Sequence, residues 1–399
     1  MRPPASGWRE LPPSGSSSPT AFARLARAHA ASAAGDALVA IGLAGSLFFS
    51  ISPEAARGKV ALYLLLTMAP FALVAPLIGP LLDRRRGSRR AVVVGSLAGR
   101  ALLCFLMARH LQGVLLFPEA FGALVLGKGY GVAKAALVPS VVGDPAELVQ
   151  ANAKLTLTSG VMGFVAAGPG LALHQLGGRW VLGLAGCVFV VGAIVALAIP
   201  ATAQAHPRSA AERAELRSAG VVLAASAMAV LRAIVGFLAF LLAFDFRADD
   251  APAWWFGLVI AASGVGTMLG AVAAPVVRRW VREERILAGS LFLAATGGLV
   301  ALRAGGRGSG VVLGLSVGAA ASAGRLCFDA IVQRDAPDAD KGRSFARFET
   351  QFQLVWVAAA LVPVALSVPT DAGYLVITVA AVVAGVSYIT GRQPWKLKS

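Results

Sequence analysis

Twelve stretches of about 20 mostly apolar residues recur along this 399-residue sequence. They lie at residues 31–52, 60–82, 90–109, 112–136, 150–173, 178–200, 220–244, 253–277, 286–303, 309–333, 345–367 and 372–390. About 20 residues of helix cross a hydrocarbon core roughly 30 Å thick, and a helix satisfies its own backbone hydrogen bonds in lipid. The sequence therefore predicts an all-α membrane protein with 12 transmembrane helices, arranged as two pseudo-symmetric six-helix bundles.

The charged residues are too few and too localised for a water-soluble protein. They make up 14% of the chain, against roughly 25% in soluble domains. The net charge of +16 comes from basic residues in short gaps between the apolar stretches, where they orient a membrane protein and meet anionic headgroups. We therefore expect a lipid bilayer as a partner and no nucleic acid.

A long polar connection divides the chain into two sets of six stretches. It covers residues 201–219 and separates a predicted N-terminal bundle, 29–200, from a C-terminal bundle, 220–391. Residues 1–28, whose first 20 positions are rich in Pro, Ser and Gly, are predicted to be a disordered cytoplasmic tail, and residues 392–399 form a second tail. Similar short patterns at equivalent places in both halves favour a parallel repeat.

The distribution of basic residues predicts the orientation. Of the 36 Lys and Arg residues, 24 fall on the side that holds both chain ends, and this side is cytoplasmic by the positive-inside rule. Arginine greatly outnumbers lysine, which is typical of a GC-rich bacterial genome. We expect a multi-pass protein of the bacterial plasma membrane with both termini cytoplasmic.

The sequence indicates no cofactor, metal or nucleotide site. The three cysteines and four histidines are scattered, without the close spacing of metal ligands or a disulfide framework. A phosphate-binding GxxxxGK[ST] loop does not occur. We therefore expect no metal and no cofactor.

The loop after the second stretch reads GPLLDRRRGSRR at residues 79–90. It resembles the signature loop of the major facilitator superfamily, with Gly79, Asp83 and Arg84 in register and Gly87 one residue late. The resemblance implies two six-helix bundles that rock about a central site. It also implies a conformational gate, in which Asp83 pairs with Arg343 or Arg347 at the start of the eleventh span.

Two further segments resemble particular branches of that superfamily. Gly168-Pro169-Gly170 looks like a partial form of an antiporter motif, although Phe164 stands where a glycine is expected. Asn152 and the run at 340–343 resemble the efflux branch that includes siderophore and macrolide exporters. These likenesses imply an exporter.

Carboxylates inside the apolar stretches are candidate proton carriers. An ionisable group at bilayer depth costs about 2.5–3.5 kcal/mol on insertion scales, so those present are expected to be paired or to face water. Asp36 and Glu119 are the proton-coupling candidates. The alternative is that each is a structural partner, Asp36 for Lys134 at a comparable depth and Glu119 for Arg100.

The remaining charges and several aromatic residues within the spans are candidates for a substrate cavity. Arg325 and Asp329 are four residues apart and share a helical face, which predicts an intrahelical ion pair that Glu349 could join. Arg232 has no carboxylate nearby in sequence, so we expect it to contact a solute or span 10 or 11. The full set of cavity candidates is Arg100, Lys128, Arg232, Arg325, Asp329, Phe240 and Trp356.

These features favour a secondary active transporter that works as a monomer. We expect proton-coupled export of a small amphipathic organic molecule by alternating access. The alternatives are a lipid flippase or a non-transporting sensor on the same fold. An integral membrane lipid-modifying enzyme is a further alternative that short loops and dispersed acids disfavour, so the chain is not expected to be an enzyme.

Overall fold

The computed structural model describes residues 19–43, 87–142, 144, 147–201, 219–248, 252, 254–335 and 341–391. Within these residues the chain is helical. The helices are α1 (Pro19–Leu43), α4 (Ser88–Arg109), α5 (Leu116–Val142), α6 (Leu148–His174), α7 (Gly178–Leu197), α9 (Ala219–Ala248), α10 (Trp254–Arg278), α11 (Glu283–Ala304), α12 (Gly306–Asp335), α13 (Lys341–Ala365) and α14 (Thr370–Gly391).

Ten of these helices are long and apolar enough to cross a membrane, and α1 is not among the ten. Each begins and ends within a few residues of a predicted span. The predicted span at 60–82 lies outside the described residues, so the total of twelve stays a prediction.

Helix α1 begins at Pro19, twelve residues before the predicted start of the first span, so residues 19–28 are helical and the predicted tail is too long. Proline is favoured at the first position of a helix because it has no N–H to leave unpaired. Leu25 is fully buried, whereas Arg24 is exposed and donates a hydrogen bond of 2.9 Å to the carbonyl of Ala198 at the end of α7. A search for apolar runs misses this segment because it is an amphipathic extension that carries arginines.

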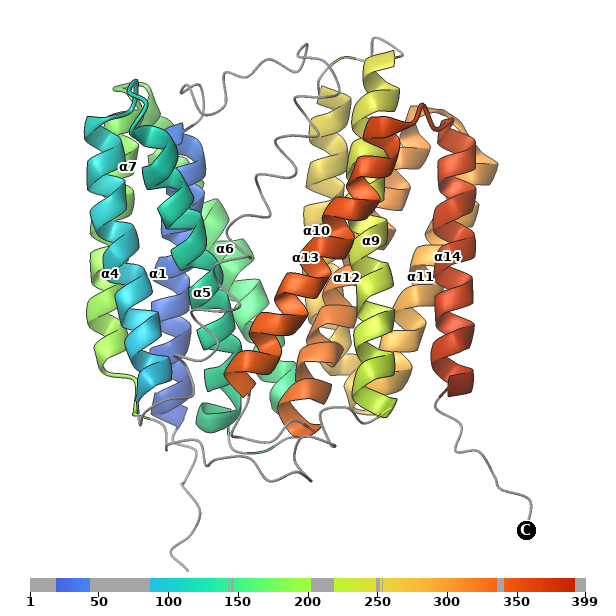
Figure 1. Cartoon of the computed structure of the whole chain (residues 1–399), viewed down its shortest axis with the longest axis horizontal. Coiled ribbons are helices and arrows are strands. Elements are labelled where there is room, and N and C mark those ends of the chain that lie inside the picture. The colour runs from blue at the N-terminus through green and yellow to red at the C-terminus, as the bar shows by residue number, and fades with distance from the viewer. Residues whose placement is uncertain are drawn as a thin grey trace, which may run out of the picture.

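The helices form two groups (Figure 1). Helices α1 and α4 to α7 pack with one another, and α9 to α14 form the second group. The groups converge at the end of the molecule where α14 ends, and there α5 and α6 lie against α12 and α13. At the opposite end the two groups lie farther apart in Figure 1.

Glycines allow close helix contacts in the second group. A Cβ atom at Gly266 or Gly270 of α10 would collide with the backbone carbonyl of Leu315 or Ala319 on α12. Small residues are favoured at such positions in membranes because close backbone approach increases van der Waals contact. The second group therefore has a tightly packed pair of helices next to the first group.

Candidate functional site

A cavity of about 320 Å³ lies between the two groups. Helices α5 and α6 line it from the first group, and α12 and α13 line it from the second. Its polar and charged lining residues are Lys128, Lys134, Asn152, Thr156, Arg325, Asp329 and Glu349. Because both halves of the chain contribute, any relative movement of the halves changes this cavity.

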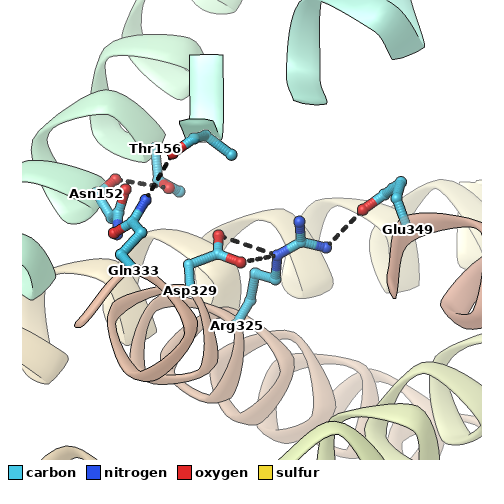
Figure 2. A network of polar contacts seen from close by, with 7 residues as sticks. Asn152, Thr156, Arg325, Asp329, Gln333 and Glu349 are labelled. Carbon is cyan, nitrogen blue, oxygen red and sulfur yellow. Dashed lines mark hydrogen bonds and ion pairs between the residues drawn. The ribbon is translucent and has the colours of Figure 1, made fainter. Parts of the chain in front are cut away.

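One face of α12 carries two charged residues and an amide. Arg325, Asp329 and Gln333 follow one another at intervals of four residues and extend toward the first group (Figure 2). The Arg325 Nε donates to both carboxylate oxygens of Asp329, at 2.9 and 3.0 Å, and its Nη1 donates to Glu349 Oε2 at 2.9 Å. The predicted intrahelical pair is therefore present, and Glu349 joins it from α13.

Two lysines face this cluster from α5. Lys134 interacts electrostatically with Asp329, and Lys128 with Glu349. A Cβ atom at Gly131, between them, would meet nothing within 4 Å, so the glycine leaves open space in the lining. The carboxylates of the second group are thus shared with cations of the first.

Arg232 of α9 adds a fourth cation near the cavity. It interacts electrostatically with Glu349 of α13, the predicted eleventh span. Its Nε is buried and has no hydrogen-bond partner among the described residues. Three basic side chains, Lys134, Arg232 and Arg325, therefore share the two carboxylates, so positive charges outnumber negative ones among these five described residues.

Four of the cavity candidates lie outside the lining: Arg232, described above, and Phe240, Trp356 and Arg100. Phe240 and Trp356 contact each other edge to face, with ring centroids 6.1 Å apart, and pack in a separate apolar cluster of the second group. Arg100 lies inside the first group. For Phe240, Trp356 and Arg100, the sequence did not reveal that the side chains lie away from the cavity.

Arg100 is buried, with 3% of its side chain exposed, and forms an ion pair with Asp36 of α1. It also donates to Ser32 Oγ at 3.1 Å, and its guanidinium lies 4.0 Å from the centroid of the Phe189 ring. The predicted pairing of Asp36 with Lys134 is therefore wrong. Lys134 lies on the face of α5 that lines the cavity toward α12, away from this partner.

Glu119 is also paired differently from the prediction. Its Oε1 lies 2.5 Å from Nδ1 of His110, just beyond the end of α4, so the predicted pair with Arg100 is wrong. The loop between α4 and α5 is short, and it brings His110 back over the first turn of α5. A local partner therefore takes the place of the more distant arginine.

A polar contact chain beside Arg100 was not anticipated from the sequence. The two ring nitrogens of His29 lie 3.2 Å from the hydroxyl of Tyr130 and 2.7 Å from that of Ser159. Hydroxyl groups donate or accept, so they can satisfy both nitrogens of a neutral imidazole. The usable signal was the spacing of His29, Ser32 and Asp36, which places all three on one face of α1.

A buried amide pair joins the two groups. Asn152 of α6 donates to the side-chain oxygen of Gln333 at 2.8 Å, and Gln333 donates to the carbonyl of Ala135 on α5 at 3.0 Å (Figure 2). Both amides are less than 10% exposed. Asn152 had been noted only for its likeness to exporters, and Gln333 had been missed because its partners are about 180 and 200 residues away.

The predicted conformational gate is only partly described. Gly79, Asp83 and Arg84 lie outside the described residues, as does the side chain of Arg343, so the pairing of Asp83 stays a prediction. Gly87 precedes α4 with φ of 80°, in the left-handed region, and its carbonyl accepts from Ala91 N–H at 2.9 Å. A glycine is favoured there because other residues are strained at positive φ.

At the equivalent place in the second half, the charges pair within the second group. Arg278 donates to Glu283 at 2.6 Å, and Arg334 bridges Glu283 and Glu284 at 3.2 and 3.1 Å. These contacts tie the adjoining ends of α10, α11 and α12 together.

The antiporter-like motif lies in α6, with Pro169 inside the helix. A Cβ atom at Gly170 would lie 3.1 Å from Leu38 and 2.9 Å from Ile41 of α1, whereas one at Gly168 would meet nothing within 4 Å. Gly170 therefore permits the close packing of α6 on α1.

Two groups of helices, most of them long and apolar enough to span a membrane, around a charged cavity are typical of membrane transporters. The sequence profile of the Major Facilitator Superfamily matches residues 28–360. The chain belongs to this superfamily, as the loop at 79–90 had indicated.

Mycobacterial proteins are among its relatives. An uncharacterised MFS-type transporter of Mycobacterium tuberculosis is 31% identical over 409 residues, which cover 91% of this chain and 88% of that protein. An uncharacterised protein of Mycobacterium leprae is 28% identical over 367 residues, covering 81% of this chain and 63% of that protein. The chain thus spans less than two thirds of the length of the second relative.

Solved transporter structures share the fold. A bacterial homologue of the iron transporter ferroportin in an outward-facing state matches with a TM-score of 0.68 and 18% identity, over 93% of this chain and 99% of that one. The transporter FucP in its outward conformation matches with a TM-score of 0.70 and 14% identity, over 95% and 100%. At these identities the likeness shows the fold alone.

Proposed function

We propose that this chain is a proton-coupled secondary transporter that exports small amphipathic organic anions by alternating access. It acts as a monomer in the bacterial plasma membrane, with both termini cytoplasmic. The observation that carries the proposal is the excess of positive charge at the cavity between the two groups, where Lys134, Arg232 and Arg325 share Asp329 and Glu349.

The charge balance selects an anion. Asp329 and Glu349 are both engaged by Arg325, so they only partly compensate Lys134 and Arg232. Uncompensated charge at bilayer depth is unfavourable, and a bound anion removes that cost. The carboxylates in turn set an upper limit on the charge that the site accepts.

The size and the apolar part of the lining select a small amphipathic molecule. Val132, Leu155, Leu326 and Phe345 line the cavity beside the charges. A volume of about 320 Å³ lies at the lower end of the range for small-molecule sites, roughly 300–1,000 Å³. A single ring or a short chain that carries one anionic group fits these limits.

The contacts between the groups support alternating access. The Asn152–Gln333 pair joins them near the end where α14 ends. With that end cytoplasmic, the conformation is outward-facing, and transport requires the amide pair to break and the opposite ends to close. Each bundle keeps its own internal contacts during such a movement.

The first group supplies the proton-coupling residues in this proposal. Protonation of Asp36 would neutralise the partner of Arg100 and so couple proton binding to the position of α1 relative to α4. The likeness of Gly168-Pro169-Gly170 to an antiporter motif supports export in exchange for protons.

Binding of a permanently charged probe tests the anion site. Purified protein in detergent should be stabilised against thermal unfolding by benzenesulfonate and not by benzenesulfonamide, which has nearly the same shape without the charge. Lys134→Gln should weaken benzenesulfonate binding about tenfold, since a hydrogen bond to a charged group contributes about 1.5–3 kcal/mol. Lys154→Gln, at an exposed position on α6, is the matched control and should bind like the wild type.

The proposal is wrong if the neutral sulfonamide stabilises the protein as well as the sulfonate does. It is also wrong if a cationic probe, benzylamine, binds in preference to both. Equal loss of binding in the Lys134 and Lys154 variants would assign the effect to surface charge.

A further inference from the structure

A groove runs along the outer surface of the first group, between α4 and α7, away from the central cavity. These two helices pack against each other at the edge of the molecule (Figure 1). Small residues form its floor, including Ala101 of α4 and Ala193 of α7, and larger side chains form its walls. This part encloses about 440 Å³, and its described lining is entirely apolar.

The groove continues into a second space of about 810 Å³ toward the end of α4. Leu102 and Phe105 line both spaces, so the two are continuous. Both side chains are exposed, at 60% and 40%. From Val94 to Arg109 the groove follows α4 for about 22 Å at 1.5 Å per residue, which exceeds one leaflet of a hydrocarbon core roughly 30 Å thick.

The far end of the groove is positively charged. Arg109, the last residue of α4, and Arg179, in the first turn of α7, line the same space, and both are exposed. The guanidinium of Arg179 lies 5.5 Å from the ring centroid of Trp180. No carboxylate lines this space among the described residues, and the nearby Glu119 is engaged by His110.

This convergence of arginines is unusual for its side of the membrane. Only 7 of the 36 basic residues fall on the side away from the chain termini in the predicted topology, and two of these seven share one groove. A tryptophan beside them is typical of the membrane interface. The arginines, the tryptophan and the apolar part of the groove thus follow one another in the order of a phospholipid's charged headgroup, its interfacial region and its acyl chain.

We infer that the groove between α4 and α7 is a binding site for a phospholipid with an anionic headgroup. The phosphate and headgroup contact Arg109 and Arg179, and one acyl chain lies along Phe105 and Leu102 toward Ala98. A second copy of this chain fits less well, because a two-fold contact through the groove would bring the four arginines of two copies together. The site is separate from the proposed transport cavity and does not depend on it.

Lipid binding to the purified full-length protein tests this inference. Native mass spectrometry should show stronger retention of 1-palmitoyl-2-oleoyl phosphatidylglycerol than of phosphatidylcholine with the same acyl chains. Each basic residue near a charged lipid surface contributes a factor of about 5 in affinity, so Arg109→Gln with Arg179→Gln should reduce phosphatidylglycerol affinity about 25-fold. Phosphatidylcholine affinity should fall much less, because its choline group offsets the charge of the phosphate.

Two further variants separate this site from general surface effects. Arg303→Gln with Arg307→Gln removes two arginines from the α11–α12 connection, at the same end of the second group, and should leave phosphatidylglycerol binding unchanged. Ala98→Phe places an aromatic ring in the groove from an exposed position. It should weaken the binding of both lipids, because the ring occupies the place of the acyl chain.

Three results would overturn the inference. The wild type could retain the two lipids equally, or the Arg109 and Arg179 double variant could keep the wild-type selectivity for phosphatidylglycerol. The third result is an equal loss of phosphatidylglycerol affinity in the Arg303 and Arg307 double variant. A dimer in light scattering that the Ala98→Phe variant abolishes would instead assign the groove to a second copy of the chain.

Discussion

The two charge clusters of this chain differ in how they relate to the two helix groups. Asp36 and Arg100 both belong to the first group, and all of their described contacts lie inside it. Arg325, Asp329 and Glu349 belong to the second group, but they face lysines of the first across the cavity. A movement of one group against the other leaves the first cluster's partners in place and changes the second cluster's surroundings.

This difference assigns separate tasks to the clusters. The interface cluster responds to whatever occupies the cavity and to the conformation of the whole molecule. The described contacts of the cluster inside the first group involve neither the cavity nor the second group, so in the proposed mechanism it responds to protons. The predictions below test this separation.

The largest effect is expected from Arg325→Met. The change leaves Asp329 and Glu349 without their shared hydrogen-bond donor. Removal of one partner from a fully buried ion pair costs about 3–5 kcal/mol, and the loss here should approach the lower end because Arg325 is 31% exposed. Thermal unfolding in detergent should show a much less stable protein, and a triple variant that adds Asp329→Asn and Glu349→Gln should recover most of the loss.

The matched change in the other cluster is Arg100→Met. Asp36 is 60% exposed, so water solvates its carboxylate when the arginine is gone, and the loss of stability should be smaller than for Arg325→Met. A loss of stability equal to or larger than that of Arg325→Met would show that the Asp36–Arg100 pair is at least as shielded from water as the cluster around Arg325.

Asp36→Asn should uncouple transport from protons while the protein stays folded. The amide oxygen still accepts a hydrogen bond from Arg100, but the side chain no longer changes charge. Inverted membrane vesicles with an imposed pH gradient should show no gradient-driven uptake of benzenesulfonate, although the purified variant binds it normally. Gradient-driven uptake at the wild-type rate would remove Asp36 from the coupling mechanism.

The two clusters also differ in how far sequence could predict them. The Arg325–Asp329 pair was predictable because a separation of four residues places two side chains on one helical face regardless of the fold. The Asp36–Arg100 pair was not, because depth in the membrane follows from sequence whereas the direction of a side chain does not. Much of α5 is apolar on all sides. Hydrophobic periodicity therefore does not reveal whether the face that holds Lys134 points toward the cavity.

The same limit applies to the fold as a whole. Ten of the apolar stretches predicted from the sequence correspond to helices long and apolar enough to span a membrane. They were predictable because lipid requires long apolar segments. Contacts between helices distant in sequence, such as that of Asn152 with Gln333, depend on how the two halves meet. Nothing local in the chain specifies that arrangement.

Gln333→Leu tests the contact that joins the groups. The variant loses two hydrogen bonds that exist only while the groups touch at this end, and each contributes about 1 kcal/mol. The conformation in which the groups touch at this end should therefore lose population by about 30-fold, the equivalent of about 2 kcal/mol. Spin labels at Gln175 and Ala304, with Cys187→Ser to remove the exposed native cysteine, should show a larger fraction of short distances.

The smallest effect is expected from Ser159→Ala, which removes one hydrogen bond from His29 inside the first group. The thermal stability should fall by about 0.5–1.5 kcal/mol, the usual contribution of a single hydrogen bond. The distances between the labels at Gln175 and Ala304 should not change, because the lost contact is present whichever way the groups are oriented. A shift in those distances as large as that of Gln333→Leu would mean that the polar chain around His29 senses the position of the second group, and the separation between the two clusters would then fail.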